Sequence, residues 1–182
     1  MVTVSRGYSY TGERSIRTSV LSSFAYDRMS RPNASTTAVV GYNILVVKNL
    51  DLSQQSLTCT GWYTLLWHDE RLMWNPGVYD NTEYIHALEE EIWKPEILIN
   101  NAVENVGLVS DDHLIYRIKY TGEVEWEPLV SSTVDCGIDV TYFPFDTQEC
   151  NIELTSWGLP DTELNLTPLW DSINLDEYRQ SH

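Results

Sequence analysis

The sequence predicts an all-β protein, an antiparallel β-sandwich with one α-helix at its N-terminal end. Two observations lead to this prediction: only one segment has helical spacing of its apolar residues, and the rest consists of short β-rich runs separated by turn signals. The length of 182 residues suits one well-filled core. We therefore expect a single domain over residues 1–182, with the helix at about 13–29 and the sandwich at about 36–182.

Composition and charge limit the classes of function. The chain is 42% hydrophobic and 12% aromatic, which excludes a disordered protein. It carries 27 acidic and 11 basic side chains, a formal net charge of -16. Such a surface repels nucleic acid and attracts cations, although solubility explains the charge equally well. No run reaches the roughly 18 to 20 apolar residues of a membrane span, so we expect membrane contact only through a pore domain outside these residues.

The predicted helix runs from Glu13 to Met29. Its apolar residues recur at a helical spacing and define one face. They are Ile16, Val20, Leu21 and Phe24. Because Pro32 cannot continue a helix, the pair Arg31-Pro32 marks its end.

Two strands follow the helix. Ala38–Val47 is rich in β-branched and aromatic residues, and a polar, turn-like stretch separates it from Ser56–His68. Alternate positions of the second strand are apolar and include Cys59 and Trp67, which predicts a buried free thiol at Cys59 rather than an intermolecular disulfide. Trp62 lies among threonines on the opposite face, so it is either a stray surface aromatic or part of a binding wall.

A hairpin is predicted farther along the chain. His113–Tyr120 and Glu123–Glu127 flank the dipeptide Thr121-Gly122, which has the composition of a two-residue hairpin turn. In the second arm Val124 and Trp126 share one face, and three glutamates share the other. A solvated edge that discourages aggregation is the simplest explanation of this row of carboxylates.

Residues 136–150 read C-G-I-D-V-T-Y-F-P-F-D-T-Q-E-C, so thirteen residues separate Cys136 from Cys150. This spacing and the centre Phe143-Pro144-Phe145-Asp146 resemble the signature loop of the Cys-loop ligand-gated channels, which include the nicotinic acetylcholine receptors. A disulfide closing about fifteen residues removes roughly 3 kcal/mol of unfolded-chain entropy. We expect a rigid projection anchored by packing of its Phe and Pro side chains, which in a full receptor would press on the membrane domain.

The resemblance extends over nearly the whole chain. It includes Trp67–Asn75, Trp93–Glu96 and Thr155–Trp157 as well as the N-terminal helix. It implies an immunoglobulin-like sandwich in a homo- or hetero-pentamer, with a small cationic ligand such as acetylcholine or nicotine bound at each subunit interface and no cofactor. In this family the ammonium group rests on tryptophan and tyrosine faces, a cation–π contact worth on the order of 2 kcal/mol. The implied location is extracellular, either secreted or at the outer face of the plasma membrane.

The resemblance also assigns ligand-binding positions. Trp157 stands where the family's loop B tryptophan touches the agonist cation, and Trp62 stands at the loop D tryptophan of the complementary subunit. Trp62 is also the aromatic that strand alternation places on a polar face, so the two arguments agree. Arg117, Glu125 and Glu127 fall at loop E positions, which predicts a charged complementary wall instead of an apolar one.

Two departures from the family pattern lead us to expect weak or altered binding. Asn100 stands at the position of the loop A tyrosine, and its amide cannot stack on an ammonium group. The sequence ends at His182, inside a stretch similar to loop F, so loop C and the C-terminal strands around it are missing. The open alternatives are a ligand-silent truncated subunit that acts as an assembly partner or regulator, and a soluble protein that buffers transmitter.

Enzymatic chemistry has little support. The candidate groups are His68-Asp69-Glu70, His86 with Glu89 and Glu90, and Asp111-Asp112-His113. No nucleophile or closely spaced ligand set completes any of them, so we expect neither an enzyme nor a metal site. A solvated charge run explains residues 89–91 better than weak calcium binding does.

Two sequons fit a secreted protein. They are Asn33-Ala34-Ser35 and Asn165-Leu166-Thr167, and they predict glycosylation of Asn33 and Asn165.

Overall fold

The computed structural model describes residues 9–22, 24–103, 107–109 and 115–178. In these ranges it contains one α-helix, ten β-strands and two short 3-10 turns. The elements are α1 (Tyr10–Val20), β1 (Thr36–Asp51), β2 (Ser56–His68), two 3-10 turns (Glu70–Leu72 and Pro76–Val78), β3 (Tyr84–Ala87), β4 (Leu98–Ile99), β5 (Gly107–Leu108), β6 (Tyr116–Lys119), β7 (Glu123–Trp126), β8 (Leu129–Asp135), β9 (Leu154–Thr155) and β10 (Leu164–Pro168). The fold is the predicted all-β sandwich with one N-terminal helix.

The larger sheet has seven strands in the order β10-β1-β2-β7-β6-β3, and β8 also pairs with β2. β2 is the organising strand because its first half pairs with β8 and its second half with β7. The pairs between these strands are antiparallel as predicted, except that β1 and β10 run parallel from Thr36↔Leu164 to Val40↔Pro168. A parallel pair requires a long crossover, and nearly the whole sandwich lies between these two strands in the sequence.

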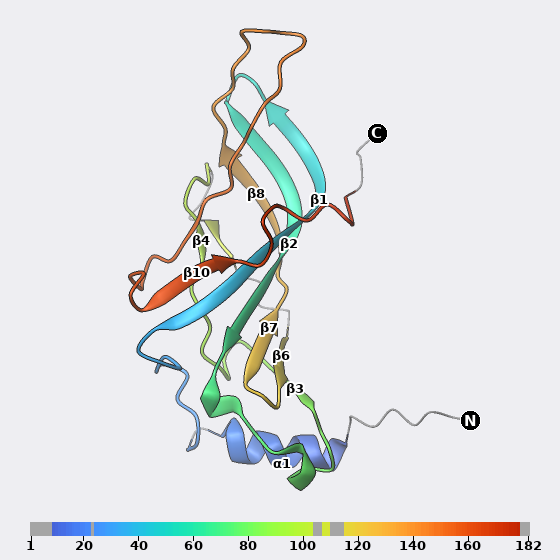
Figure 1. Cartoon of the computed structure of the whole chain (residues 1–182), viewed down its shortest axis with the longest axis vertical. Helices are drawn as coiled ribbons and strands as arrows, with labels where there is room; N and C mark the ends of the chain where they lie inside the picture. The colour runs from blue at the N-terminus through green and yellow to red at the C-terminus, as the bar shows by residue number, and fades with distance from the viewer. Residues whose placement is uncertain (1–8, 23, 104–106, 110–114, 179–182) are drawn as a thin grey trace, which may run out of the picture.

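The smaller sheet consists of β5, β4 and β9 in that order. Buried residues of both sheets form one core with an aromatic centre. The rings of Tyr116 and Trp126 stack with centroids 5.1 Å apart, and Trp67 meets Tyr116 and Trp93 edge to face. Aromatic rings prefer these geometries. Figure 1 shows α1 at one end of the sandwich and the loop of residues 136–150 at the other.

Strand alternation in β2 and β7 agrees with the sequence prediction. Cys59 and Trp67 are buried, and Cys59 is a free thiol. Val124 and Trp126 are buried as well. Trp62 lies on the opposite face of β2 and is only half-buried. The register of β2 therefore decides which aromatic side chains stay available to a ligand.

The predicted bounds of the helix are wrong at both ends. α1 begins at Tyr10, because the Ser9 side chain accepts a hydrogen bond from the Gly12 backbone N–H at 3.2 Å and caps the first turn. It ends at Val20, well before the proline at position 32, and Phe24 is fully exposed instead of lying on the buried face. The burial of Tyr26 competes with continuation of the helix, because it requires the residues after Val20 to leave the helical path.

Tyr26 belongs to a buried polar network around Asp69, whose side chain is completely inaccessible to solvent. The Tyr26 hydroxyl donates to Asp69 Oδ2 at 2.6 Å and accepts from the Trp93 backbone N–H at 3.0 Å. Arg71 donates from Nε and Nη2 to both Asp69 oxygens, at 2.9 and 2.7 Å. Its Nη1 donates to the backbone oxygens of Asp27 and Ser30. The network therefore ties three chain segments together and satisfies a buried charge.

Tyr26→Phe tests this network. The change leaves a buried carboxylate oxygen and the Trp93 N–H each without one partner, so we expect a loss of about 1–3 kcal/mol in the free energy of unfolding. Urea denaturation followed by tryptophan fluorescence measures it. Tyr10→Phe, at an exposed position, is the matched control and should change little. Equal stability of both variants would show that the Tyr26 hydroxyl contributes nothing to stability.

The buried tyrosines also predict alkaline sensitivity. Burial is the main cause that raises the pKa of Tyr26, Tyr42 and Tyr63 above the ordinary value of 10.0. A raised folded-state pKa gives stabilisation that is complete below pH 10 and is lost as pH rises above it. We expect unfolding free energies to fall above pH 10 by up to about 1.4 kcal/mol per pH unit per tyrosine. In Tyr26→Phe the unfolding free energy should fall less steeply with pH, because one of the three buried hydroxyls that titrate is absent.

Candidate functional site

The residues assigned to the complementary side of the site lie on one face of the larger sheet. Trp62 pairs with Leu129 of β8, and two positions on, Thr64 lies opposite Glu127 and donates a hydrogen bond to its Oε1 at 3.3 Å. Leu66 pairs with Glu125, which in turn pairs with Arg117 of β6. Directly paired residues of antiparallel strands share a face. The structure therefore brings Trp62, Arg117, Glu125 and Glu127 together on one surface.

A tight turn holds the charged hairpin in this register. Gly122 has φ of 86°, a left-handed conformation that glycine adopts without strain, and its carbonyl accepts from the Asp69 N–H at 2.9 Å. β6 and β7 form the predicted hairpin, although the structure places the first arm at Tyr116–Lys119. The residues that would extend it to 113 lie partly outside the described ranges.

The charges on this face are mostly paired. Arg117 Nη1 lies 3.4 Å from Glu125 Oε2, and its guanidinium stacks 4.0 Å above the centre of the Tyr84 ring. Lys119 Nζ lies 2.8 Å from Glu123 Oε2. This hydrogen bond is the first cause that lowers the pKa of the Glu123 carboxyl. Glu127 differs from its neighbours because, within the described part of the chain, it accepts a hydrogen bond from the Thr64 hydroxyl and forms no ion pair.

The residues assigned to the principal side lie beside the smaller sheet. Trp157 follows β9 and is 81% exposed, which is unusual for so large an apolar side chain. Asn100 follows β4, where its backbone N–H donates to the Glu153 carbonyl at 2.7 Å and its amide donates to Glu153 Oε2 at 3.1 Å. β4 and β9 are paired neighbours, so the structure positions both residues from one strand pair. No described contact joins them to Trp62.

The loop of residues 136–150 is closed by the predicted disulfide between Cys136 and Cys150, with Cα atoms 5.0 Å apart. The expectation that its Phe and Pro side chains anchor it by packing is wrong, because Phe143, Pro144 and Phe145 are all exposed, Phe145 at 91%. The peptide bond between Phe143 and Pro144 is cis. Hydrogen bonds hold the loop instead, since Gln148 bonds to the Asp139 carbonyl and to Asp146 Oδ2. The apolar tip is therefore free for another surface.

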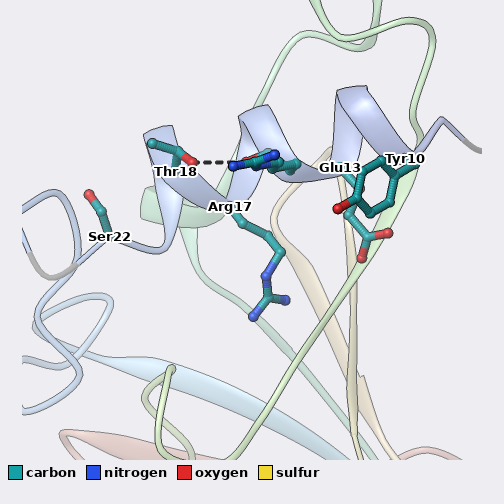
Figure 2. Close-up of a pocket in the computed structure, with 6 residues that line it drawn as sticks. Tyr10, Glu13, Arg17, Thr18 and Ser22 are labelled. Carbon is teal, nitrogen blue, oxygen red and sulfur yellow. Dashed lines mark hydrogen bonds between the residues drawn. The ribbon is translucent and has the colours of Figure 1, made fainter.

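A hollow of about 680 Å³ lies along α1, lined by Tyr10, Glu13, Arg14, Arg17, Thr18 and Ser22. Figure 2 shows Arg17 extending away from the helix below this row of side chains. Its guanidinium donates to the His86 carbonyl and pairs with Glu91 at 2.5 Å, so it joins α1 to β3 and to the segment after β3. None of the predicted ligand-binding residues lines this hollow.

The structure describes only some of the other candidates from the sequence. In the described part of the chain no group of three His, Cys, Asp or Glu side chains is placed to hold a metal ion. Asp69 is occupied by the structural network, and residues 111–113 lie outside the described ranges. Asn33 and Asn165 are both exposed, as the predicted glycosylation of their sequons requires. No helix among the described residues has the length and apolar composition needed to cross a bilayer.

Sequence reasoning missed two aromatic side chains on the face that carries Trp62. Tyr84 lies under Arg117, and no local signal marked it. Trp170 packs over Gly41: a Cβ built on Gly41 would lie 2.3 Å from the Trp170 ring. A glycine inside a strand often marks a close approach of another group, so Gly41 was an available signal.

Comparison with known proteins identifies the family. Residues 13–182 match the model of the neurotransmitter-gated ion-channel ligand binding domain, and the chain belongs to this family. The family is one of receptor-type binding domains and not of enzymes, in agreement with the sequence prediction.

Relatives of this chain include neuronal acetylcholine receptor subunits. The alpha-3 subunits of Bos taurus and Homo sapiens are 35% and 34% identical over 161 residues, which covers 86% of this chain and 32% of each relative. The alpha-4 subunit of Mus musculus is 32% identical over 161 residues and is covered to 25%. The chain thus spans a third or less of the length of these relatives.

The disulfide offers a test of the loop. Replacing both Cys136 and Cys150 with serine opens a loop of about fifteen residues, so we expect the free energy of unfolding to fall by about 3 kcal/mol. Denaturation of the oxidised wild type and the double variant measures the difference. Cys59→Ser is the control for loss of a thiol without loss of a crosslink. Insensitivity of the wild type to reducing agent would contradict this role of the disulfide.

Proposed function

We propose that this chain is an extracellular receptor-type domain that binds small cationic ligands, such as acetylcholine or nicotine, at the interfaces of a homo- or hetero-pentamer. Trp157 of one subunit and Trp62 of its neighbour would form the two sides of each site. The observation that carries the proposal is the exposure of Trp157, at 81%, in a member of the neurotransmitter-gated family. An indole face open to solvent can receive an ammonium group from a second surface.

The separation of the two groups of residues supports an interface site. Trp157 and Asn100 follow strands of the smaller sheet. Trp62, Arg117 and Glu125 lie in strands of the larger sheet, and Glu127 directly follows one of them. Two subunits placed side by side could each present one group. The names of the relatives point the same way, because all are subunits of acetylcholine receptors.

Altered specificity is part of the proposal. Asn100 offers no aromatic face and its amide is already bonded to Glu153. The opposite wall carries carboxylates and a guanidinium in place of apolar side chains. A ligand with polar groups around its cationic centre therefore suits this wall better than one with an apolar tail.

A ligand-silent subunit is the second candidate, and Asn100 is the observation that favours it. Such a chain would keep the faces that assemble into the ring and serve as an assembly partner or regulator. A soluble protein that buffers transmitter is a variant of the first candidate, with the same site and no pore.

The test combines solution mass with ligand titration. We expect five-fold mass and acetylcholine or nicotine binding that Trp157→Ala weakens about 30-fold, the equivalent of a 2 kcal/mol cation–π contact. Phe24→Ala removes an exposed aromatic outside the site and serves as the control. A pentamer that binds neither ligand would favour the ligand-silent subunit. A monomer would contradict self-assembly of these residues.

A further inference from the structure

The side chains of Trp62, Glu127 and Trp170 lie around Thr64 on the larger sheet of one protomer. Glu127 lies opposite Thr64 on one side, and Gly41 of β1 pairs with Thr64 on the other. The Trp170 ring covers Gly41, and Trp62 is the next residue of β2 on the same face. Diagonal neighbours in a sheet are about 7–8 Å apart, so Trp62 and Glu127 are within reach of one small ligand.

Backbone hydrogen bonds fix the position of Trp170. The Leu169 N–H donates to the Val40 carbonyl at 2.9 Å, and the Asn174 N–H donates to the Tyr42 carbonyl at 3.0 Å. Figure 1 shows the segment after β10, drawn in red, passing beside β1. Trp170 is thus held between two anchor points, and 37% of it remains exposed.

The floor of the cluster is polar and buried. Asn43 donates to the Thr64 hydroxyl at 3.3 Å, and Thr64 donates to Glu127 at 3.3 Å, so a chain of hydrogen bonds orients the carboxylate. Asn43 and Thr64 are 5% and 8% exposed, because the larger side chains stand over them. Glu127 itself is exposed and ready to pair with a cation.

Charge pairing singles out Glu127. Arg117 neutralises Glu125 and Lys119 neutralises Glu123, but no basic side chain of the described ranges lies within ion-pair distance of Glu127. An unneutralised carboxylate beside two partly exposed indoles attracts an organic cation through both charge and ring faces. A metal ion fits poorly, since hard cations require several oxygen ligands.

We propose that Trp62, Glu127 and Trp170 form an ammonium-binding subsite that is complete within one protomer. It deepens the proposed function, because Trp62 and Glu127 belong to the complementary wall, and it adds Trp170. Unlike the interface site, it needs neither Trp157 nor a second subunit. The ligand class is an organic ammonium ion, and a ligand with two such groups would occupy this subsite and Trp157 together.

Choline and its neutral analogue 3,3-dimethyl-1-butanol test the proposal. The two have the same shape, so a difference between them reports charge alone. We expect the N-methyl proton resonance of choline to shift upfield on binding, as it does over aromatic rings. The neutral alcohol should bind at least about 10-fold more weakly.

Four variants complete the experiment. Trp170→Ala and Glu127→Gln should each weaken choline binding about 10-fold. Glu123→Gln, which alters a carboxylate neutralised by Lys119 on the same face, should leave choline binding unchanged. Trp157→Ala should still bind choline with an upfield shift, because the subsite does not include Trp157. Thermal unfolding confirms that each variant is folded.

The outcomes separate the two proposals. Loss of choline binding in Trp157→Ala but not in Trp170→Ala would overturn the subsite and keep the interface site. The reverse pattern would establish the subsite whether or not the interface site exists. Equal binding of choline and the alcohol would overturn the subsite as well.

Discussion

The buried carboxylate of Asp69 is the constraint on which the rest of the structure depends. A charge with no access to solvent must be fully paired, and Arg71 and Tyr26 supply the partners. Meeting that requirement sets the path of the chain after α1, starts the 3-10 turn at Glu70, and fixes Trp93 through its backbone N–H. Trp93 in turn packs edge to face against Trp67 in the aromatic core. The Asp69 N–H donates to the Gly122 carbonyl, in the turn that sets the register of β6 and β7.

Strand β2 contributes side chains both to the core and to the surface of the candidate site. Its alternation separates the buried side chains, such as Trp67, from the outward ones, such as Trp62 and Thr64. Its partner β7 brings carboxylates to the outward side, and β6, which pairs with β7, adds the cations Arg117 and Lys119. The same strand therefore supplies the core and the candidate site, so a shift of one residue in its register would lose both.

The features that depend on local periodicity could be predicted from the sequence. The burial of Cys59, the outward position of Trp62 and the β6–β7 hairpin all follow from alternation and a single Gly turn. The disulfide and the positions of Trp157 and Trp62 were predicted from resemblance to a family, and membership of that family is confirmed.

The end of α1, the parallel pairing of β10 and the packing of Trp170 could not be predicted, because distant contacts decide them. Tyr26 and Asp69, for example, are 43 residues apart. The exposure of Phe143 and Phe145 was also mispredicted, since apolar composition alone does not say which surface covers a side chain.

The parallel strand β10 and the residues after it have a further consequence for association. They cover the outer edge of β1 from Thr36 to Ile44, where backbone donors and acceptors would otherwise be open to another chain. At the opposite end of the sheet, β3 is only four residues long. A long uncovered edge is a template for uncontrolled strand addition. Residues 164–174 therefore occupy the backbone groups at this edge of the larger sheet, so a second chain cannot add a strand along this part of β1.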